Sequence, residues 1–77
     1  MPQFFFHVRQ NKVLFEDTRG GEFVDVRAAW DWAIADARAM MEKGEISGRP
    51  DQSWLEICDQ TGTLVASLPF VRVVQLH

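Results

Sequence analysis

The sequence predicts an α+β domain of order ββαββ, in which a four-stranded antiparallel sheet carries one helix on one face. Three observations lead to this fold class. Residues 26–43 contain neither Gly nor Pro and place apolar side chains at helical spacing. Two short segments rich in aromatic and β-branched residues precede this run, and two more follow it. Turn sequences separate the two members of each pair, as hairpins of antiparallel strands require.

The first pair of strands is expected at 3–9 and 12–16, joined by a turn at Gln10-Asn11 because Asn tolerates positive φ. Side chains alternate between the two faces of a strand. The first strand therefore has one face with Phe4, Phe6 and Val8 and another with Phe5, His7 and Arg9. In the second strand Val13 and Phe15 share a face. The glycine-containing segment 17–21 is expected to form a turn.

The helix is expected to span about 26–43, with Asp25 as its N-cap and Gly44 in the left-handed conformation that ends it. A stripe about 140° wide gathers its apolar residues. The stripe contains Val26, Ala29, Trp30, Ala33, Ile34, Ala37, Met40 and Met41. Charged residues at i,i+4 spacing, such as Arg27 and Asp31, indicate a solvated flank.

The second pair of strands is expected at 54–58 and 63–68, after a polar loop at 45–52. The sequence Asp59-Gln60-Thr61-Gly62 fits a turn between them with Gly62 at positive φ. Pro69 should end the last strand or leave it at an edge. Residues 71–76 are apolar enough to form either a short extra strand or a short helix.

The expected core lies between the helix and one face of the sheet. On the helix we expect Trp30, Ala33, Ala37 and Met41 to be buried. On the sheet we expect them to meet Phe4, Phe6, Val13, Phe15, Leu55 and Ile57.

Length and charge restrict the function further. With 77 residues the chain can build one hydrophobic core, so we expect a single domain over 1–77. A net charge of −3 argues against nucleic-acid backbone or anionic membranes as the main partner. One cysteine forms no internal disulfide, and the sequence has no export signal or membrane span, which predicts a cytoplasmic protein.

No residue pattern predicts catalysis, a cofactor or a metal. His7 has no second ligand or nucleophile at a useful spacing and is expected to be a structural strand histidine. Cys58 lacks a neighbouring base and is expected to be an inert small residue. The acidic residues around the 17–21 turn lack the alternating ligand pattern of a calcium loop. We therefore expect a non-enzymatic protein without catalytic, cofactor-binding or metal-binding residues.

Two surfaces are candidate interfaces. Outside the helix stripe, one flank carries a large aromatic among small residues and no charge, which suits close packing against another element. This flank consists of Ala28, Trp32, Ala35 and Ala39, and either a second copy of the chain or the 71–77 tail is expected to cover it. On the sheet face away from the helix, Phe5 and Trp54 are two further exposed aromatics.

The chain resembles a small family of uncharacterised bacterial proteins. The opening Met1 to Arg9 matches its Met-Pro-x-aromatic-aromatic-Phe-His-Val-Arg motif, and Asp59, Gly62, Pro69 and Phe70 match its closing hairpin and Pro-Phe pair. Gln10-Asn11 replaces the family's Asp-Gly turn, and the chain departs from the pattern after Phe70. The resemblance covers most of residues 1–70 and implies a fold, with no established activity.

Two functions of different classes follow as hypotheses. The first is a protein-interaction or accessory module, acting on an unidentified protein partner or as a weak homodimer. The alternative is a nucleic-acid-linked regulator that stacks single-stranded RNA on Phe5 and Trp54 near Arg9. The predicted strand-turn-acid-helix order at the start of the chain is also loosely similar to the fold of HicB-type antitoxins, in which such a domain contacts a partner toxin. This fold-level analogy makes an antitoxin-like regulator a further form of the alternative hypothesis.

Overall fold

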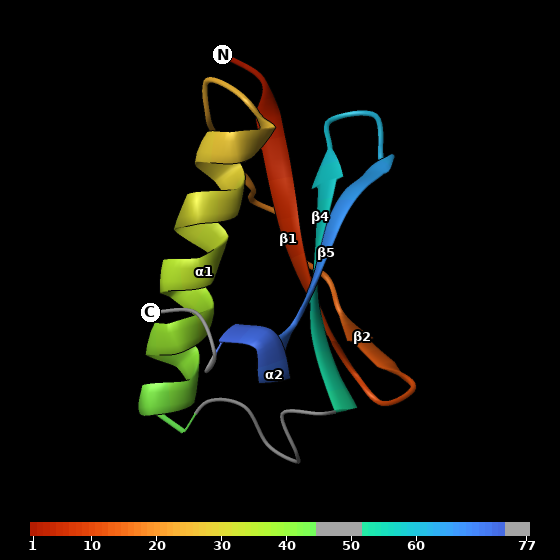
Figure 1. Cartoon of the computed structure of the whole chain (residues 1–77). Helices are drawn as coiled ribbons and strands as arrows, with labels where there is room; N and C mark the ends of the chain where they lie inside the picture. The colour runs from red at the N-terminus through yellow and green to blue at the C-terminus, as the bar shows by residue number, and fades with distance from the viewer. Residues whose placement is uncertain (45–51, 74–77) are drawn as a thin grey trace.

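The computed structural model describes residues 1–44 and 52–73 and has the predicted α+β fold (Figure 1). The order of elements along the chain is β1 (Gln3–Gln10), β2 (Val13–Phe15), β3 (Gly21–Glu22), α1 (Val26–Glu42), β4 (Ser53–Asp59), β5 (Leu64–Pro69) and α2 (Phe70–Val73). The main elements follow the ββαββ order that the sequence predicts.

All strand pairs in the sheet are antiparallel, and the spatial order is β2-β1-β4-β5. The short strand β3, which the sequence analysis did not predict, also pairs with β1. It occupies the same side of β1 as β2, because β4 takes the other side along Phe4–Gln10. The outer side of β1 is therefore paired at both ends, by β2 at 8–10 and by β3 at 3–4.

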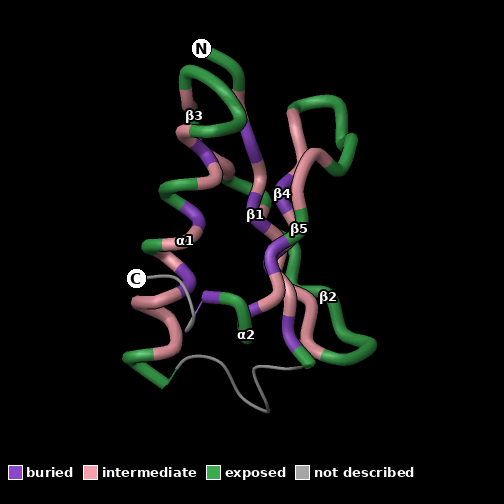
Figure 2. Tube along the Cα trace, viewed as in Figure 1, coloured by how far each residue is buried: buried purple, intermediate pink, exposed green. Residues whose placement is uncertain are grey.

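Helix α1 lies along one face of the sheet, with buried residues at intervals along its length (Figure 2), and these buried residues are alanines. Ala29, Ala33 and Ala37 are fully buried and occupy successive turns of the helix. Their small side chains allow the helix backbone to approach the sheet closely. The rest of the core comes from the sheet and α2 and contains Phe4, Phe6, Leu55, Ile57, Leu68, Phe70 and Val73.

The predicted core is confirmed at Ala33 and Ala37 and at four sheet positions, but it is wrong at its margins. Trp30 and Met41 are only half-buried and pack beside the alanine line. Val13 and Phe15 are 55% and 54% exposed. They share the face of Val8, which Phe15 pairs with, but β2 is an edge strand of the sheet and has a neighbouring strand on one side only.

The predicted helix caps and the two positive-φ hairpin residues are confirmed, while the strand ends differ by at most one residue from the prediction and Gln10 belongs to β1 rather than to the turn. The Asp25 carboxylate caps α1 by accepting a hydrogen bond from the Ala28 N–H at 2.8 Å. Asn11 has a φ of 55° in the first hairpin, and Gly62 has a φ of 85° in the last. Gly44, with a φ of 70°, follows the C-cap residue Lys43.

The chain after the last strand forms a helix in its described part. Helix α2 follows Pro69 directly and buries Phe70 and Val73 in the core. Of the predicted segment 71–76, residues 74–76 lie outside the described residues, as do 45–51 of the predicted 45–52 loop. No helix in the described parts of the chain is long and apolar enough to cross a membrane.

Candidate functional site

Trp32 lies on the side of α1 that faces the β2 edge of the sheet, and its ring reaches back onto the core. The ring centroids of Trp32 and Phe6 are 4.8 Å apart, and those of Trp32 and Phe23 are 5.8 Å apart. Phe6 and Phe23 meet edge-on at 5.7 Å. Tilted and edge-on arrangements are the favourable ones for aromatic rings. Trp32 is nevertheless 45% exposed. Its contacts with Phe6 and Phe23 therefore fix the position of a large aromatic ring that remains partly accessible to solvent.

Beside this cluster runs a groove of about 590 Å³ between α1 and the β2 edge, which we call the Trp32 groove. Aromatic and aliphatic side chains form its floor, and a loop with charged residues forms one rim. The apolar lining comprises Phe6, Val8, Phe15, Phe23, Trp32, Met40 and Leu55. The rim includes Glu16, Asp17, Arg19 and Glu22.

Asp17 organises the rim loop through backbone hydrogen bonds. Its carboxylate accepts the N–H of Phe6 at 3.1 Å, at the point of β1 that neither β2 nor β3 pairs. It also accepts the N–H of Arg19 at 3.0 Å and of Gly20 at 3.1 Å. Burial opposes ionisation of this carboxyl, but these hydrogen bonds and the nearby His7 outweigh it and hold the pKa of Asp17 below its ordinary value. Asp17 is therefore a carboxylate at neutral pH.

His7 has the structural role that the sequence analysis favours. Its Nδ1 accepts the backbone N–H of Asp17 at 2.9 Å. The ring stacks on Phe5, with centroids 6.5 Å apart and planes 8° apart. His7 and Asp17 thus bind the loop to β1 from two directions.

Gly20 brings this loop against β1 more closely than a side chain would allow. Its φ is +68°, and a Cβ at this position would lie 2.7 Å from the carbonyl oxygen of Phe4 and 2.9 Å from the ring of Phe5. The rim of the Trp32 groove therefore depends on a glycine here.

The predicted interface residues do not form one surface. Ala28 and Ala39 are half-buried and Ala35 is exposed, on the helix surface beside Trp32. Phe5 and Trp54 lie on the opposite face of the sheet and are half-buried. The 71–77 tail does not cover Trp32 with its described part, because α2 packs against the other side of α1.

On that opposite face of the sheet, Arg9 and Glu56 form a salt bridge of 3.0 Å. Cys58 follows in the same strand as Glu56. Burial, together with the negative charges of Glu56 and Asp59, raises the pKa of the Cys58 thiol. The thiolate, which is the reactive form of cysteine, is therefore disfavoured.

Phe15, Phe23 and Asp17 belong to the site but were not predicted as site residues. The usual hydrophobic-staple signal concerns the residue directly before the N-cap, which here is Val24, and Val24 is 67% exposed, so this signal would not have indicated Phe23. The contact of Asp17 with Phe6 spans 11 residues and depends on how the loop crosses β1, for which the sequence carries no local signal.

The comparisons with known proteins identify a family. No curated protein and no solved structure matches the chain significantly. One family model matches residues 3–71, which cover both groove-forming segments of the sheet and the whole of α1. The chain therefore belongs to the family described as a domain of unknown function, DUF6894.

Proposed function

We propose that this domain is a non-enzymatic protein-interaction module that binds a basic, apolar segment of a partner protein in the Trp32 groove. The observation that carries this proposal is the state of Trp32, which is 45% exposed while its ring packs at a tilt against the buried Phe6. A tryptophan fixed in this way loses little conformational entropy on binding, and tryptophan is enriched among residues that dominate binding energies.

The exposed apolar surface extends beyond Trp32. Phe15 on β2 is 54% exposed and lines the same groove. Val13, on the same strand, is 55% exposed. Large exposed aromatics that line one groove, as Phe15 and Trp32 do, are typical of an interaction site.

The charges of the rim favour a basic partner. Glu16, Asp17 and Glu22 line the groove against one cation, Arg19. Complementary charge speeds association and excludes wrong partners. The same negative charges oppose a two-fold contact in which the grooves of two copies face each other, because both copies then bring an acidic rim to the contact. They also oppose the phosphates of RNA, so the groove supports a protein partner over the nucleic-acid alternative.

The proposed module acts in the cytoplasm. Its sequence supports this location, because a chain with one cysteine does not depend on an internal disulfide, and such bonds are rare in a reducing compartment.

The proposal is tested with a fluorescein-labelled peptide of about six residues that alternates lysine and phenylalanine, and with its glutamate counterpart. The wild-type protein should bind the lysine peptide and shift the indole N–H resonance of Trp32 in NMR spectra. Trp32→Gln should weaken binding by roughly ten-fold, as loss of an interface tryptophan does. Leu64→Gln, which changes a residue 54% exposed on β5, is the matched control and should leave binding intact.

Three results would contradict the proposal. The first is equal binding of both peptides, and the second is equal affinity of the Trp32 and Leu64 variants. The third is self-association of the free protein at about 100 μM in sedimentation that Trp32→Gln abolishes, because this would make a second copy the occupant of the groove.

A further inference from the structure

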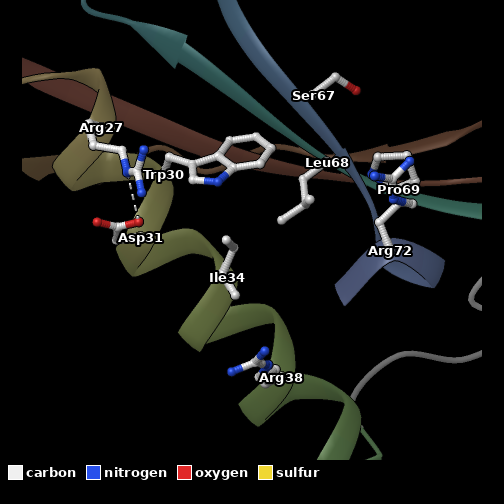
Figure 3. A pocket seen from close by; sticks show the side chains of 9 residues that line it. All are labelled: Arg27, Trp30, Asp31, Ile34, Arg38, Ser67, Leu68, Pro69 and Arg72. Atoms are coloured by element: carbon white, nitrogen blue, oxygen red, sulfur yellow. Dashed lines mark hydrogen bonds and ion pairs between the residues drawn. The ribbon is translucent and has the colours of Figure 1, made fainter. Parts of the chain in front are cut away.

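A second groove, of about 630 Å³, lies on the other side of α1 and has the opposite charge. We call it the Trp30 groove (Figure 3). Its apolar lining is Trp30, Ile34, Leu68 and Pro69. Figure 3 shows the Trp30 ring extending from α1 toward Leu68 on β5, with Ile34 one turn further along the helix. The groove is therefore bounded by α1 on one side and by the end of β5 with α2 on the other.

Three arginines surround this apolar lining. Arg27 and Arg38 come from α1 and Arg72 from α2. They are three of the eight Lys and Arg residues in a chain whose net charge is −3. Asp31 is the only acidic residue of the lining, and it forms a salt bridge of 3.2 Å with Arg27. Arg38 and Arg72 form no salt bridge within the described residues.

The positions of the arginines favour an elongated occupant. Arg27 and Arg38 are 11 positions apart on one helix, so their Cα atoms are separated by about 16 Å along its axis. This length equals about five residues of extended chain. A single small anion spans only a fraction of that distance, whereas a peptide with several carboxylates reaches both ends.

The strand beside the groove favours an extended occupant as well. β5 is the last strand on its side of the sheet, and its outer edge has no partner strand among the described residues. Backbone N–H and C=O groups along such an edge are able to pair with an added strand. A segment in this position also turns alternate side chains toward the sheet's helix face, where Trp30, Ile34 and Leu68 lie.

We infer that the Trp30 groove binds an extended acidic segment of a protein, with its carboxylates near the arginines and its apolar side chains on Trp30 and Leu68. This site is separate from the Trp32 groove and does not depend on it. Charge complementarity selects the acidic segment, because the groove carries a local excess of two positive charges within an acidic protein. A long nucleic acid would extend beyond the groove onto the rest of the protein, which carries a net negative charge and repels phosphates. A short acidic peptide is therefore the favoured polyanion.

The test uses the full chain, labelled with ¹⁵N, and a peptide of about six residues that alternates glutamate and valine. The peptide should shift the indole N–H resonance of Trp30, while that of Trp32 stays in place. Single Trp→Phe variants assign the three indole resonances. A peptide with lysine in place of glutamate should leave the Trp30 resonance unchanged. Affinity for the glutamate peptide should fall as the salt concentration rises, because the contact is between charges.

The variant for this test combines Arg38→Glu with Arg72→Glu. Reversing both charges should weaken binding of the glutamate peptide by at least about ten-fold. Lys12→Glu, which reverses one positive charge at an exposed position in the β1–β2 turn, should change affinity by less than about two-fold. Far-ultraviolet circular dichroism of each variant verifies that the fold is intact. Trp32→Gln should have no effect on this peptide, so failure of one proposal is distinguishable from failure of the other.

Several results would overturn the inference. One is the absence of any shift at Trp30 at about 1 mM peptide, and another is equal binding by the double arginine variant. Tighter, arginine-dependent binding of a single-stranded oligouridylate would show that the groove recognises nucleic acid instead.

Discussion

Replacement of Gly20 by alanine tests the account of the rim loop most directly. Gly20 and Gly62 both adopt positive φ, at +68° and +85°. An added methyl group at Gly62 would meet nothing within 4 Å, whereas at Gly20 it would lie 2.7 Å from the backbone oxygen of Phe4. The two substitutions therefore share the same backbone penalty and differ only in what the methyl group contacts.

The magnitudes follow from this comparison. Alanine in the left-handed region costs about 1 kcal/mol, and this is the whole expected effect of Gly62→Ala. At Gly20 the Phe4 oxygen belongs to β1, which is paired on both sides, so the strand or the loop has to move. Overpacking of this kind costs a further ~1–3 kcal/mol. We expect Gly20→Ala to lower the free energy of unfolding by about 3 kcal/mol, from a total of roughly 4–12 kcal/mol for a domain of this size.

Urea unfolding followed by tryptophan fluorescence measures the difference. With a slope of about 1 kcal/mol per molar urea, the Gly20→Ala midpoint should lie about 2 M below that of Gly62→Ala. If Gly20→Ala is already partly unfolded in water, its far-ultraviolet circular dichroism shows this directly. Midpoints that agree within about 0.3 M would refute the close approach of the loop to β1.

Three further outcomes are expected. Asp17→Ala should cost about 2–4 kcal/mol in urea unfolding, because three backbone N–H groups lose their acceptor, and a cost below about 1 kcal/mol would contradict this. The pKa of Asp17 is lowered in the folded state, so the contribution of its ionisation to the free energy of unfolding is complete above the ordinary carboxyl pKa of about 4 and is lost as the pH falls through the folded pKa. Urea unfolding of the wild type at a series of pH values should show this loss of stability, and Asp17→Ala should lack it. Cys58 should react with iodoacetamide at pH 8 more slowly in the folded protein than in urea, since its pKa is raised, and faster reaction in the folded state would be inconsistent with its surroundings.

The parts of the fold that local sequence determines were predictable. The N-cap at Asp25, the turns at Asn11 and Gly62, and the alternation of β1 and β4 each depend on residues within a few positions of one another. The rotation of α1 about its axis was not predictable in the same way. Ala29 and Trp30 belong to the same apolar stripe, and close approach of the backbone to the sheet selects the alanine line and moves Trp30 to the margin.

The site was predictable only in part, for a similar reason. The helix position of Trp32 placed it outside the core stripe, on a flank that a second copy or the 71–77 tail was expected to cover, and in the structure it is 45% exposed. The contact between Trp32 and Phe6 was not predicted. A helical projection gives the direction of the Cβ atom, but it does not show that the indole ring is long enough to extend back to the sheet. The exposure of Phe15 follows from the position of β2 at the edge of the sheet, which is a property of the assembled strands.

The outer side of β1 has a consequence for how copies of this protein can polymerise. Its two neighbours there, β2 and β3, have three and two residues, with the Asp17 loop between them. Edges this short and interrupted are poor templates for a further strand. Fibre growth by strand addition needs an open edge on both sides of every unit, and among the strands that the structure describes only β5, with six residues, provides one of useful length. A strand added to β5 by another copy would therefore end the array at two molecules.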